Sequence, residues 1–323
     1  MTTILVTGAA GFIGSHLSER LLRDGHRVVG IDNFNAYYNP ALKERNIEPL
    51  QASPSFTLKR MDICEAEAVK AVFAEYKPQA VIHLAAWAGV RPSIQNPSLY
   101  SQVNVQGTVH LLDAAVEHKT ERFLFASSSS VYGNCPQAPF SEEEEVNEPI
   151  SPYAATKRAG ELLAHTYWHL YKLPIACLRF FTVFGPRQRP DLAIHKFMRM
   201  IANDEAIPVF GDGSSSRDYT FVEDIVEGIV ATLEKNDRYR IYNIGGSQPV
   251  TLSEMIASIE EVVGKSAIIH RLPMQPGDVR RTYADLTRST AELGYAPSTS
   301  FREGLRQQWA WMQEELRRGR SIT

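Results

Sequence analysis

The sequence predicts an α/β fold: a Rossmann-type, doubly wound parallel sheet with a smaller mixed α/β domain after it. Three features lead to this prediction. Short β-branched runs alternate with helical stretches, a glycine-rich turn follows the first run, and the alternation loosens after residue 180. An alternation of this kind is typical of a parallel sheet covered by helices on both faces.

The first domain is predicted over residues 1–178, where strands and helices follow one another at regular intervals. We expect strands at "TILVTG", "RVVGID", "FTLKRMDI", "AVIHLAA", "RFLFASSSS" and "LPIACLRFF". We expect helices between them at "GFIGSHLSERLLRDG", at about 65–76, at about 97–118 and at about 152–171.

The second domain is predicted over residues 179–323, where loops and short helices are more frequent. The run "RIYNIGG" predicts a strand near 240–245 that returns to the first sheet. A helix is expected after "VTLSE", and the tail 301–318 has the pattern of an amphipathic helix. Because no Pro/Ser-rich linker separates the halves, we expect the two domains to pack closely.

Composition and charge exclude several functional classes. The 323 residues are 44% hydrophobic and 22% charged, with a net charge of −3 and no basic block, which argues against a nucleic-acid partner. The three cysteines, Cys64, Cys135 and Cys177, form no CxxC pair, so we expect neither a disulfide framework nor a metal site. The chain enters a strand directly at "MTTILVTG", and we expect a cytoplasmic protein without a signal peptide or membrane span.

A glycine-rich turn, "VTGAAGFIG", joins the first strand to the first helix. Gly8, Gly11 and Gly14 are spaced GxxGxxG around Phe12 and Ile13, so that the backbone can approach a pyrophosphate at the helix N-terminus. At the end of the second strand, Asp32, followed by Asn33, is placed to accept a hydrogen bond from an adenosine ribose. A carboxylate there repels the 2′-phosphate of NADP, so the sequence predicts NAD.

An acidic residue also follows the third strand. Asp62, with Ile63 after it, is placed to contact the adenine of the dinucleotide. The alternative interpretation of Asp62 is the N-cap of the following helix.

A tyrosine and a lysine, Tyr153 and Lys157, share one face of the predicted helix in "SPYAATK". Ser151 is a good N-cap and Pro152 suits the first helical position, which places Tyr153 in the first turn. The helix dipole, Lys157 and an oxidised nicotinamide would each lower the pKa of the phenol. Such a tyrosine can remove a hydroxyl proton as hydride leaves the same carbon.

A run of four serines, residues 127–130, follows the fifth strand in "FASSSSVYG". Serines beyond a strand are often turn residues. Their place at the end of a parallel strand, where such sheets bind ligands, favours a hydroxyl partner for Tyr153.

Several further motifs occur in order along nearly the whole chain. They are "TGAAGFIG", "HLAAWAGVR", "NVQGT", "SSSSVYG", "SPYAATK", "RFFTVFGPRQRPD", "GDGSSSRDYTFVEDI" and "PGDVRRTYAD". With these motifs the chain resembles the extended short-chain dehydrogenase/reductase family, and within it the nucleotide-sugar epimerases.

The resemblance implies a catalytic triad of Ser128, Tyr153 and Lys157 and a tightly held NAD that is recycled in each turnover. The 4-hydroxyl of a UDP-sugar would lose its proton to Tyr153 and its hydride to NAD, and hydride would return to the other face of the 4-keto sugar. The resemblance also implies a homodimer through a four-helix bundle made by helices 97–118 and 152–171. Further contacts that it implies are cofactor contacts at Leu84, Ala85, Ala86, Asn104 and Phe181, a diphosphate contact at Arg217 and a ribose contact at Asp278.

The segment "RFFTVFGPRQRPD" resembles the UDP-glucuronate 4-epimerases, whose substrate carries a carboxylate at C6. Thr182 and Arg189 would contact that carboxylate, with help from Ser128 or Ser129. The alternative is that Arg187 and Arg189 are solvated or bind the diphosphate. Trp87 in "HLAAWAGVR" departs from the small or amide residue expected in this subfamily.

Other members of the family provide alternative functions. Sugar 4,6-dehydratases carry Asp-Glu where this chain has Ser129 and Ser130, which disfavours dehydration. Epimerases for UDP-glucose, UDP-N-acetylhexosamines or UDP-pentoses, and UDP-glucuronate decarboxylases, remain alternatives. A non-catalytic NAD-sensing regulator is a further alternative, against which the intact "YAATK" and the serine run argue.

Overall fold

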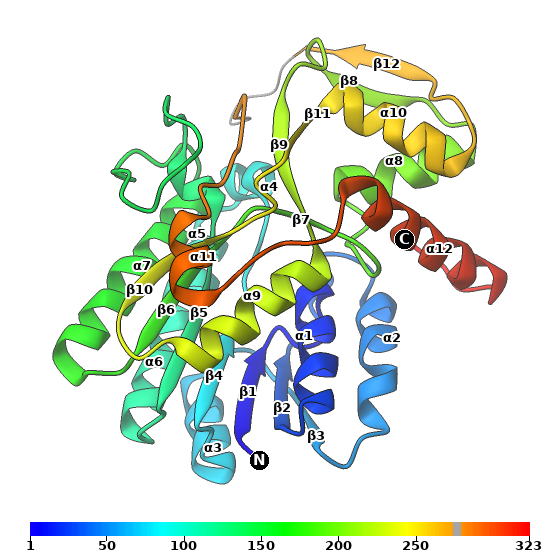
Figure 1. The fold of residues 1–323 in the computed structure, drawn as a ribbon. Coiled ribbons are helices and arrows are strands. Elements are labelled where there is room, and N and C mark those ends of the chain that lie inside the picture. Colours follow the sequence, from blue (N-terminus) through cyan, green and yellow to red (C-terminus); the bar gives the residue numbers. More distant parts are fainter. Residues whose placement is uncertain (274–278) are drawn as a thin grey trace.

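Seven parallel strands form the central sheet of the structure, a computed structural model that describes residues 1–273 and 279–323 (Figure 1). Their order is β10-β6-β5-β4-β1-β2-β3. From β1 the chain first builds the sheet in one direction and then, from β4, in the other, which confirms the predicted doubly wound fold. The strands are β1 (Thr3–Thr7), β2 (Arg27–Asp32), β3 (Phe56–Arg60), β4 (Ala80–His83), β5 (Arg122–Ser128), β6 (Ile175–Phe180) and β10 (Arg240–Ile244).

Helices cover both faces of this sheet, because successive side chains of a strand point to opposite sides. Ile4 and Val6 pack in one core cluster with residues of α1 (Phe12–Arg23), α2 (Pro40–Gln51) and α9 (Val222–Lys235). Leu5, between them, packs in the opposite cluster with residues of α3 (Ala66–Tyr76), α6 (Gly107–Glu117) and α7 (Pro152–Tyr171). The two clusters thus lie on opposite faces of the sheet.

A second, smaller assembly of strands and helices lies beyond that edge (Figure 1). It contains a three-stranded sheet ordered β11-β9-β7 and a pair of parallel strands, β8 and β12. Phe184, Phe221 and Leu305 belong to its core. Its elements are β7 (Thr182–Phe184), β8 (Ile207–Phe210), β9 (Ser216–Phe221), β11 (Pro249–Thr251), β12 (Ile269–Leu272), α8 (Ala193–Ala202), α10 (Leu252–Val263) and α12 (Phe301–Arg317), and α11 (Thr287–Leu293) packs beside β10.

The region in which one helix was expected, 97–118, is helical, but it is not a single regular α-helix. It consists of α5 (Pro97–Ser101), a π-helical turn η1 (Gln102–Gln106) and α6, and it follows a short helix, α4 (Val90–Gln95). A turn of this kind is rare and is frequently found at functional sites. Asn104 lies within it and turns its side-chain amide toward the backbone of Trp87.

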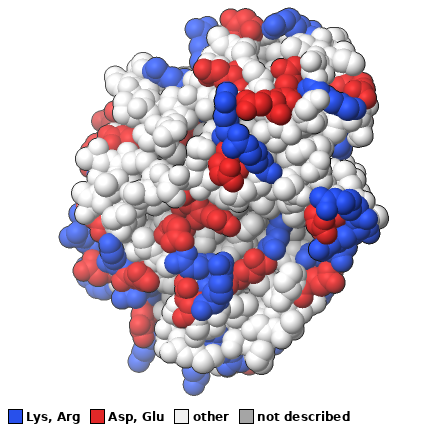
Figure 2. All heavy atoms as spheres, turned by 45° about the vertical axis from the view of Figure 1, so that its right-hand side comes forward, with Lys and Arg blue, Asp and Glu red and all other residues white. Residues whose placement is uncertain are grey.

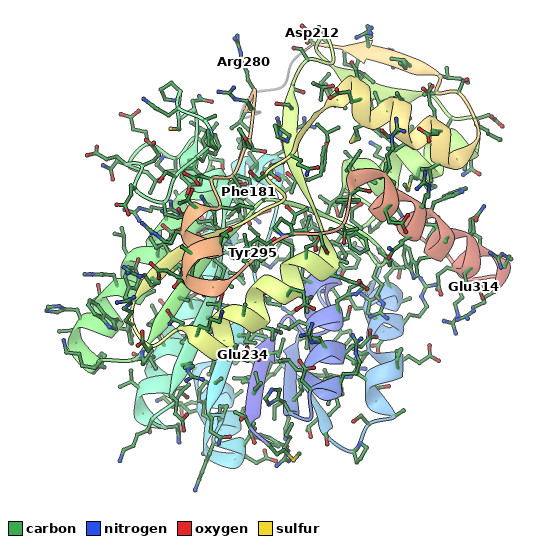
Figure 3. The ribbon with its side chains drawn as sticks, viewed as in Figure 1. Phe181, Asp212, Glu234, Arg280, Tyr295 and Glu314 are labelled. Carbon is green, nitrogen blue, oxygen red and sulfur yellow. The ribbon has the colours of Figure 1, made fainter. Side chains whose placement is uncertain are left out.

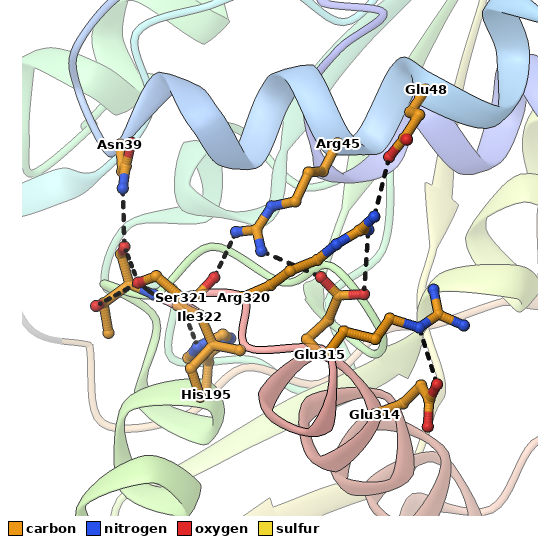
Figure 4. A network of polar contacts seen from close by, with 11 residues as sticks. Asn39, Arg45, Glu48, His195, Glu314, Glu315, Arg320, Ser321 and Ile322 are labelled. Carbon is orange, nitrogen blue, oxygen red and sulfur yellow. Dashed lines mark hydrogen bonds and ion pairs between the residues drawn. The ribbon is translucent and has the colours of Figure 1, made fainter.

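The last residues of the chain join the two parts of the molecule (Figure 4). Asn39, at the start of α2, donates to the Thr323 carbonyl at 3.0 Å, and Arg45 of α2 donates to the Ser321 carbonyl. On the other side, His195 of α8 bonds the Ile322 carbonyl at 2.9 Å. These contacts fasten α2, which covers the central sheet, to α8 and the smaller assembly.

Charged side chains of both signs are interspersed over the face of the molecule shown in Figure 2. This distribution agrees with the net charge of −3 and gives that face no single sign. Among the described residues, no helix combines the length and the apolar character that crossing a membrane would need.

Candidate active site

A cavity of about 480 Å³ opens at the carboxyl ends of the central strands. It brings together most of the residues that the sequence singled out, although they come from segments 180 residues apart. The predicted site residues that line it are Gly8, Gly11, Phe12, Ile13, Gly14, Asp32, Asn33, Asp62, Ile63, Leu84, Ala85, Ala86, Ser128, Tyr153, Lys157, Phe181, Thr182 and Arg189. Asn104, Ser129 and Arg217 do not line it, and Asp278 lies outside the described residues.

The glycine loop is packed so tightly that two of its positions exclude a side chain. A Cβ atom on Gly14 would lie 2.1 Å from the Gly8 carbonyl oxygen, and Gly8 has a left-handed φ of +71°. Gly11 caps α1 without a side-chain hydrogen bond, so the first N–H groups of the helix stay available to a ligand. The loop therefore has the cradle that a dinucleotide pyrophosphate needs.

Asp32 occupies the end of β2, where a ribose contact was predicted, and it is only 6% exposed. Its carboxylate accepts from the Ala10 N–H at 3.1 Å and from the Phe34 N–H at 2.9 Å, and Lys43 Nζ lies 3.5 Å away. These contacts hold the carboxylate in the wall of the cavity.

The alternative interpretation of Asp62 as a helix cap is wrong, because the N-cap of α3 is Glu65. Asp62 instead accepts from the Cys64 N–H at 2.9 Å and from the Asn33 side chain at 2.7 Å. It remains in the wall of the cavity, so the predicted adenine contact stays open to it.

Tyr153 and Lys157 lie on α7 as the sequence predicts. The Ser151 hydroxyl accepts from the Ala154 N–H at 3.2 Å, Pro152 follows it, and Tyr153 lies in the first turn. Lys157 Nζ donates to the Ala126 carbonyl at 2.7 Å and lies 6.0 Å from the centre of the Tyr153 ring. Burial lowers the pKa of Lys157 to about 8.

The expected lowering of the Tyr153 pKa does not follow from the chain alone. Burial raises the pKa of this phenol, and the side chain of Ser128 and the charge of Arg189 oppose the rise without cancelling it. The physical reason is that a phenolate loses its hydration in the cavity, and Ser128 and Arg189 restore only part of that energy.

The four serines have different partners. Ser128 Oγ accepts from the Ser130 N–H at 3.1 Å and lines the cavity beside Tyr153. Ser127 Oγ donates to Glu161 at 2.6 Å, and Glu161 forms a buried, bidentate ion pair with Arg179 at 2.8 and 2.9 Å. Ser129 starts a short 3₁₀ turn, η2 (Ser129–Tyr132), outside the lining. Ser127 and Ser130 line the cavity as well, but Ser128, the position predicted for the catalytic hydroxyl, is the serine whose side chain acts on the pKa of Tyr153.

Asn104 supports the cavity wall from behind. Its oxygen accepts from the Trp87 N–H at 2.8 Å, and its nitrogen donates to the Trp87 carbonyl at 3.0 Å and to Thr156 at 3.1 Å. Because these bonds occupy the side-chain amide of Asn104, the predicted contact between Asn104 and the cofactor stays a prediction. Trp87 itself lines the cavity and packs edge-on against Tyr37, with ring centres 5.2 Å apart.

The two arginines of "GPRQRPD" point to different places. Arg189 lines the cavity, whereas Arg187 pairs with Glu19 of α1 at 2.7 Å and does not line it. The backbone of Arg187 has a φ of +64°, so the chain turns sharply between the two arginines. Thr182 begins β7 at the cavity, directly after Phe181, which Figure 3 labels near the middle of the molecule.

Arg217, the predicted diphosphate contact, lies on β9, and its Nη1 donates to the Ser216 carbonyl at 2.8 Å. The lining residues that the sequence did not predict include Asn35, Tyr37, Tyr38 and Lys43. They come from the segment "NFNAYYNPALK" after β2. The only feature of the sequence that could have indicated their place in the site is that this segment follows Asp32 at the carboxyl edge of the sheet.

A doubly wound parallel sheet, a glycine loop at its first turn, and a buried tyrosine and lysine on one helix together define a dinucleotide-dependent enzyme of the short-chain dehydrogenase/reductase type. The family model described as GDP-mannose 4,6 dehydratase matches residues 5–308, and the chain belongs to this extended short-chain dehydrogenase/reductase family.

Relatives make the resemblance more specific. A UDP-glucuronate 4-epimerase of Thermodesulfobacterium geofontis is 41% identical over 320 residues, which cover 98% of each chain. An uncharacterized protein of Methanocaldococcus jannaschii is 44% identical over 313 residues, 96% of each chain. The crystal structure of UDP-glucuronic acid 4-epimerase from Bacillus cereus, in complex with UDP-glucuronic acid and NAD, matches with a TM-score of 0.92 at 38% identity, covering 97% of this chain and 99% of that one. The predicted resemblance to nucleotide-sugar epimerases is confirmed.

Proposed function

We propose that this chain is a UDP-glucuronate 4-epimerase, which interconverts UDP-glucuronate and UDP-galacturonate with tightly bound NAD. The observation that carries the proposal is one cavity that contains the glycine loop, Tyr153 and Arg189 together. The first binds a dinucleotide, the second exchanges a proton with a sugar hydroxyl, and the third binds a carboxylate.

The residues of the chain divide the work as follows. The glycine loop and the N-terminus of α1 bind the pyrophosphate, and Asp32 accepts from the adenosine ribose. Tyr153 takes the proton of the C4 hydroxyl and later returns it, Ser128 hydrogen-bonds the same oxygen, and the charge of Lys157 favours the phenolate. When bound, NAD supplies the oxidation of C4, its reversal, and a positive charge that the phenolate needs in view of its burial.

Thr182 and Arg189 hold the C6 carboxylate of the substrate. Once C4 is a ketone, a C6 carboxylate can leave as CO₂, provided that the C5–C6 bond stands roughly perpendicular to the carbonyl plane. A guanidinium and a hydroxyl that fix the carboxylate away from that angle prevent this loss. Ser129 and Ser130, where dehydratases carry Asp-Glu, supply no acid for the loss of water.

NMR of UDP-glucuronate incubated with the NAD-loaded enzyme tests the proposal directly. We expect the 4-epimer to accumulate without a pentose product, and we expect UDP-glucose at the same concentration to react far more slowly. Formation of the pentose and CO₂ would instead indicate a decarboxylase. Faster turnover of UDP-glucose would indicate a neutral-sugar epimerase, which is the second candidate because the Tyr153 side of the cavity would serve it equally.

The assembly, the location and the domain division belong to the same proposal. A homodimer through a four-helix bundle of 97–118 and 152–171 is supported by Leu162, Leu170 and Tyr171, which are 54%, 61% and 55% exposed on α7. A cytoplasmic location is supported by three free cysteines. A division near residue 178 is supported by the start of the three-stranded sheet at β7.

A further inference from the structure

Arg189 already has a carboxylate partner within the chain. Its Nε donates to Asp191 Oδ1 at 2.9 Å and its Nη2 donates to Asp191 Oδ2 at 2.8 Å. This is the side-on arrangement of a guanidinium and a carboxylate, with two parallel N–H···O bonds. Asp191 itself does not line the cavity, whereas Arg189 does.

A second, adjacent edge of the guanidinium remains available. A guanidinium has five N–H groups in one plane, and Asp191 accepts from two of them. Among the described residues, none accepts from Nη1, so Nη1 and the second N–H of Nη2 form an end-on pair. Such a pair matches the two oxygens of a second carboxylate.

A ring stack fixes the guanidinium from a third direction. The Arg189 Cζ lies 5.1 Å from the centre of the Tyr37 ring, within the range of a cation–π contact. Tyr37 packs edge-on against Trp87, and Tyr100 stands between Trp87 and Tyr153, at ring distances of 6.4 and 6.3 Å. A chain of aromatic contacts therefore sets the separation between Arg189 and the phenol of Tyr153.

The charge of Arg189 reaches the reacting end of the cavity. The guanidinium lies in the wall between this cavity and a second one, of about 470 Å³, beside α2 and α12. Its positive charge nevertheless acts on Tyr153, where it opposes the rise in the phenol pKa. Asp191 is 41% exposed, so water screens much of its negative charge, while the Arg189 side chain is only 18% exposed. A second carboxylate on the adjacent edge of the guanidinium is therefore repelled only weakly by Asp191.

We propose that Asp191 is a positioning residue that holds Arg189 side-on, so that the end-on N–H pair is presented to the C6 carboxylate of the substrate and selects uronic acids over neutral sugars. The inference rests on the proposed function and adds to it the residue that sets the direction of the carboxylate contact. It also assigns a role to Trp87, which supports Tyr37 and through it the face of the guanidinium.

A double-mutant cycle of Arg189→Ala and Asp191→Ala tests the inference on the NAD-loaded enzyme. We measure kcat and KM for UDP-glucuronate and the Kd of UDP-glucuronate and UDP-glucose. Asp191→Ala should lower kcat/KM for UDP-glucuronate roughly tenfold, the typical loss for a hydrogen bond to a charged group. It should leave the Kd of UDP-glucose within about twofold and have no further effect in the Arg189→Ala background. Asp191→Asn keeps one acceptor oxygen, so its kcat/KM for UDP-glucuronate should lie between those of the wild type and Asp191→Ala.

Glu205→Ala is the matched control. Glu205 pairs with Arg199 of α8 at 2.8 Å and is 42% exposed, which is close to Asp191 in both respects. We expect this variant to behave as the wild type with both nucleotide sugars.

Three results would overturn the inference. The first is that Asp191→Ala lowers kcat/KM for UDP-glucuronate by the same factor in the wild type and in the Arg189→Ala background. The second is that Asp191→Ala weakens the binding of UDP-glucose as much as the binding of UDP-glucuronate. The third is a gain in kcat/KM, which would show that Asp191 competes with the substrate for the guanidinium. If the wild type forms no epimer but the cycle shows coupling in the Kd of UDP-glucuronate, the proposed function fails and the Asp191–Arg189 unit stands. If the wild type forms the epimer without coupling, only the inference fails.

Discussion

Two sides of the same cavity are built in different ways. The proposed catalytic side, made by Ser128, Tyr153 and Lys157, lies on β5 and α7. The proposed recognition side, made by Thr182 and Arg189, lies on the three-residue strand β7 and the turn after it. The catalytic side is joined to the central sheet by the bond from Lys157 to the Ala126 carbonyl and by the buried pair of Glu161 and Arg179.

The recognition side depends on side chains from distant segments instead. Gln188, only 3% exposed, donates to the Val183 carbonyl and accepts from the His195 N–H and from Gln308 of α12. His16 of α1 bonds the Pro186 carbonyl at 3.0 Å. The difference teaches that the residues proposed for the proton chemistry lie on long regular elements, while those proposed for the choice of sugar lie on a short strand and a turn that side chains from distant segments hold in place.

The largest expected effect is on the catalytic side. Tyr153→Phe removes the group that exchanges the C4 proton, and we expect kcat for UDP-glucuronate to fall about a thousandfold or more. Because Arg189 is untouched, the Kd of UDP-glucuronate should change by less than about threefold. Parallel turnover and calorimetric binding measurements check both parts. A large loss of affinity with a small loss of kcat would contradict the division between the two sides.

The buried ion pair of Glu161 and Arg179, beside the catalytic side, should contribute to the stability of the protein. Glu161→Gln leaves the Arg179 charge, 1% exposed, without its carboxylate, and should lower the free energy of unfolding by about 3 kcal/mol. Urea denaturation at pH 7.5 measures this change. Glu314→Gln on α12 is the control, since its carboxylate is 41% exposed and its ion pairs are worth little. Equal effects of the two substitutions would argue against the buried pair as a support.

The recognition side can be weakened without touching the proton chemistry. Thr182→Val keeps the shape of the side chain but removes the hydroxyl, and should raise KM for UDP-glucuronate about tenfold while leaving UDP-glucose affinity unchanged. Steady-state kinetics with both nucleotide sugars make the measurement. Thr220→Val on the neighbouring strand β9 is the matched control, because the Thr220 hydroxyl is buried without a partner in the described structure. No change of KM would remove Thr182 from the carboxylate site.

The smallest expected effect concerns acid stability of the recognition side. Burial, and next the charge of Arg187, lower the pKa of His16 from 6.5 to about 4. The unfolded chain binds this proton below pH 6.5 and the folded chain does not, so stability is lost as the pH falls from about 6.5 toward 4.

Unfolding of the wild type and of His16→Gln at pH 7.5 and pH 5.5 measures this difference. Between pH 7.5 and pH 5.5, the free energy of unfolding of the wild type should fall by about 1.4 kcal/mol more than that of the variant. The reason is that pH 5.5 lies about one unit below the pKa of the histidine in the unfolded chain. Other buried histidines contribute equally to both proteins and cancel. Identical pH dependence would place His16 in contact with water.

Local sequence determined much of the fold and half of the site. The order of strands and helices in the first part, the glycine loop and the pair of Tyr153 and Lys157 all depend on spacing within one or two elements, which a sequence displays directly. The short strands of the smaller assembly escaped prediction, because three to six residues with partners far along the chain carry little periodicity. The π-helical turn at Asn104 escaped it too, since that turn contacts Trp87, which precedes it by 17 residues.

By itself, then, the sequence determined the class of fold, the dinucleotide loop and the residues available for proton transfer. Only the tertiary structure decided how they act. It turned Arg187 toward Glu19 and Arg189 into the cavity, and it joined Arg189 to Asp191 and Tyr37. It also buried Tyr153, which raises the pKa of the phenol against the fall that the sequence predicted with a bound nicotinamide. The physical reason is that burial and the direction of a side chain depend on what packs against it from elsewhere in the chain, and no local pattern contains that information.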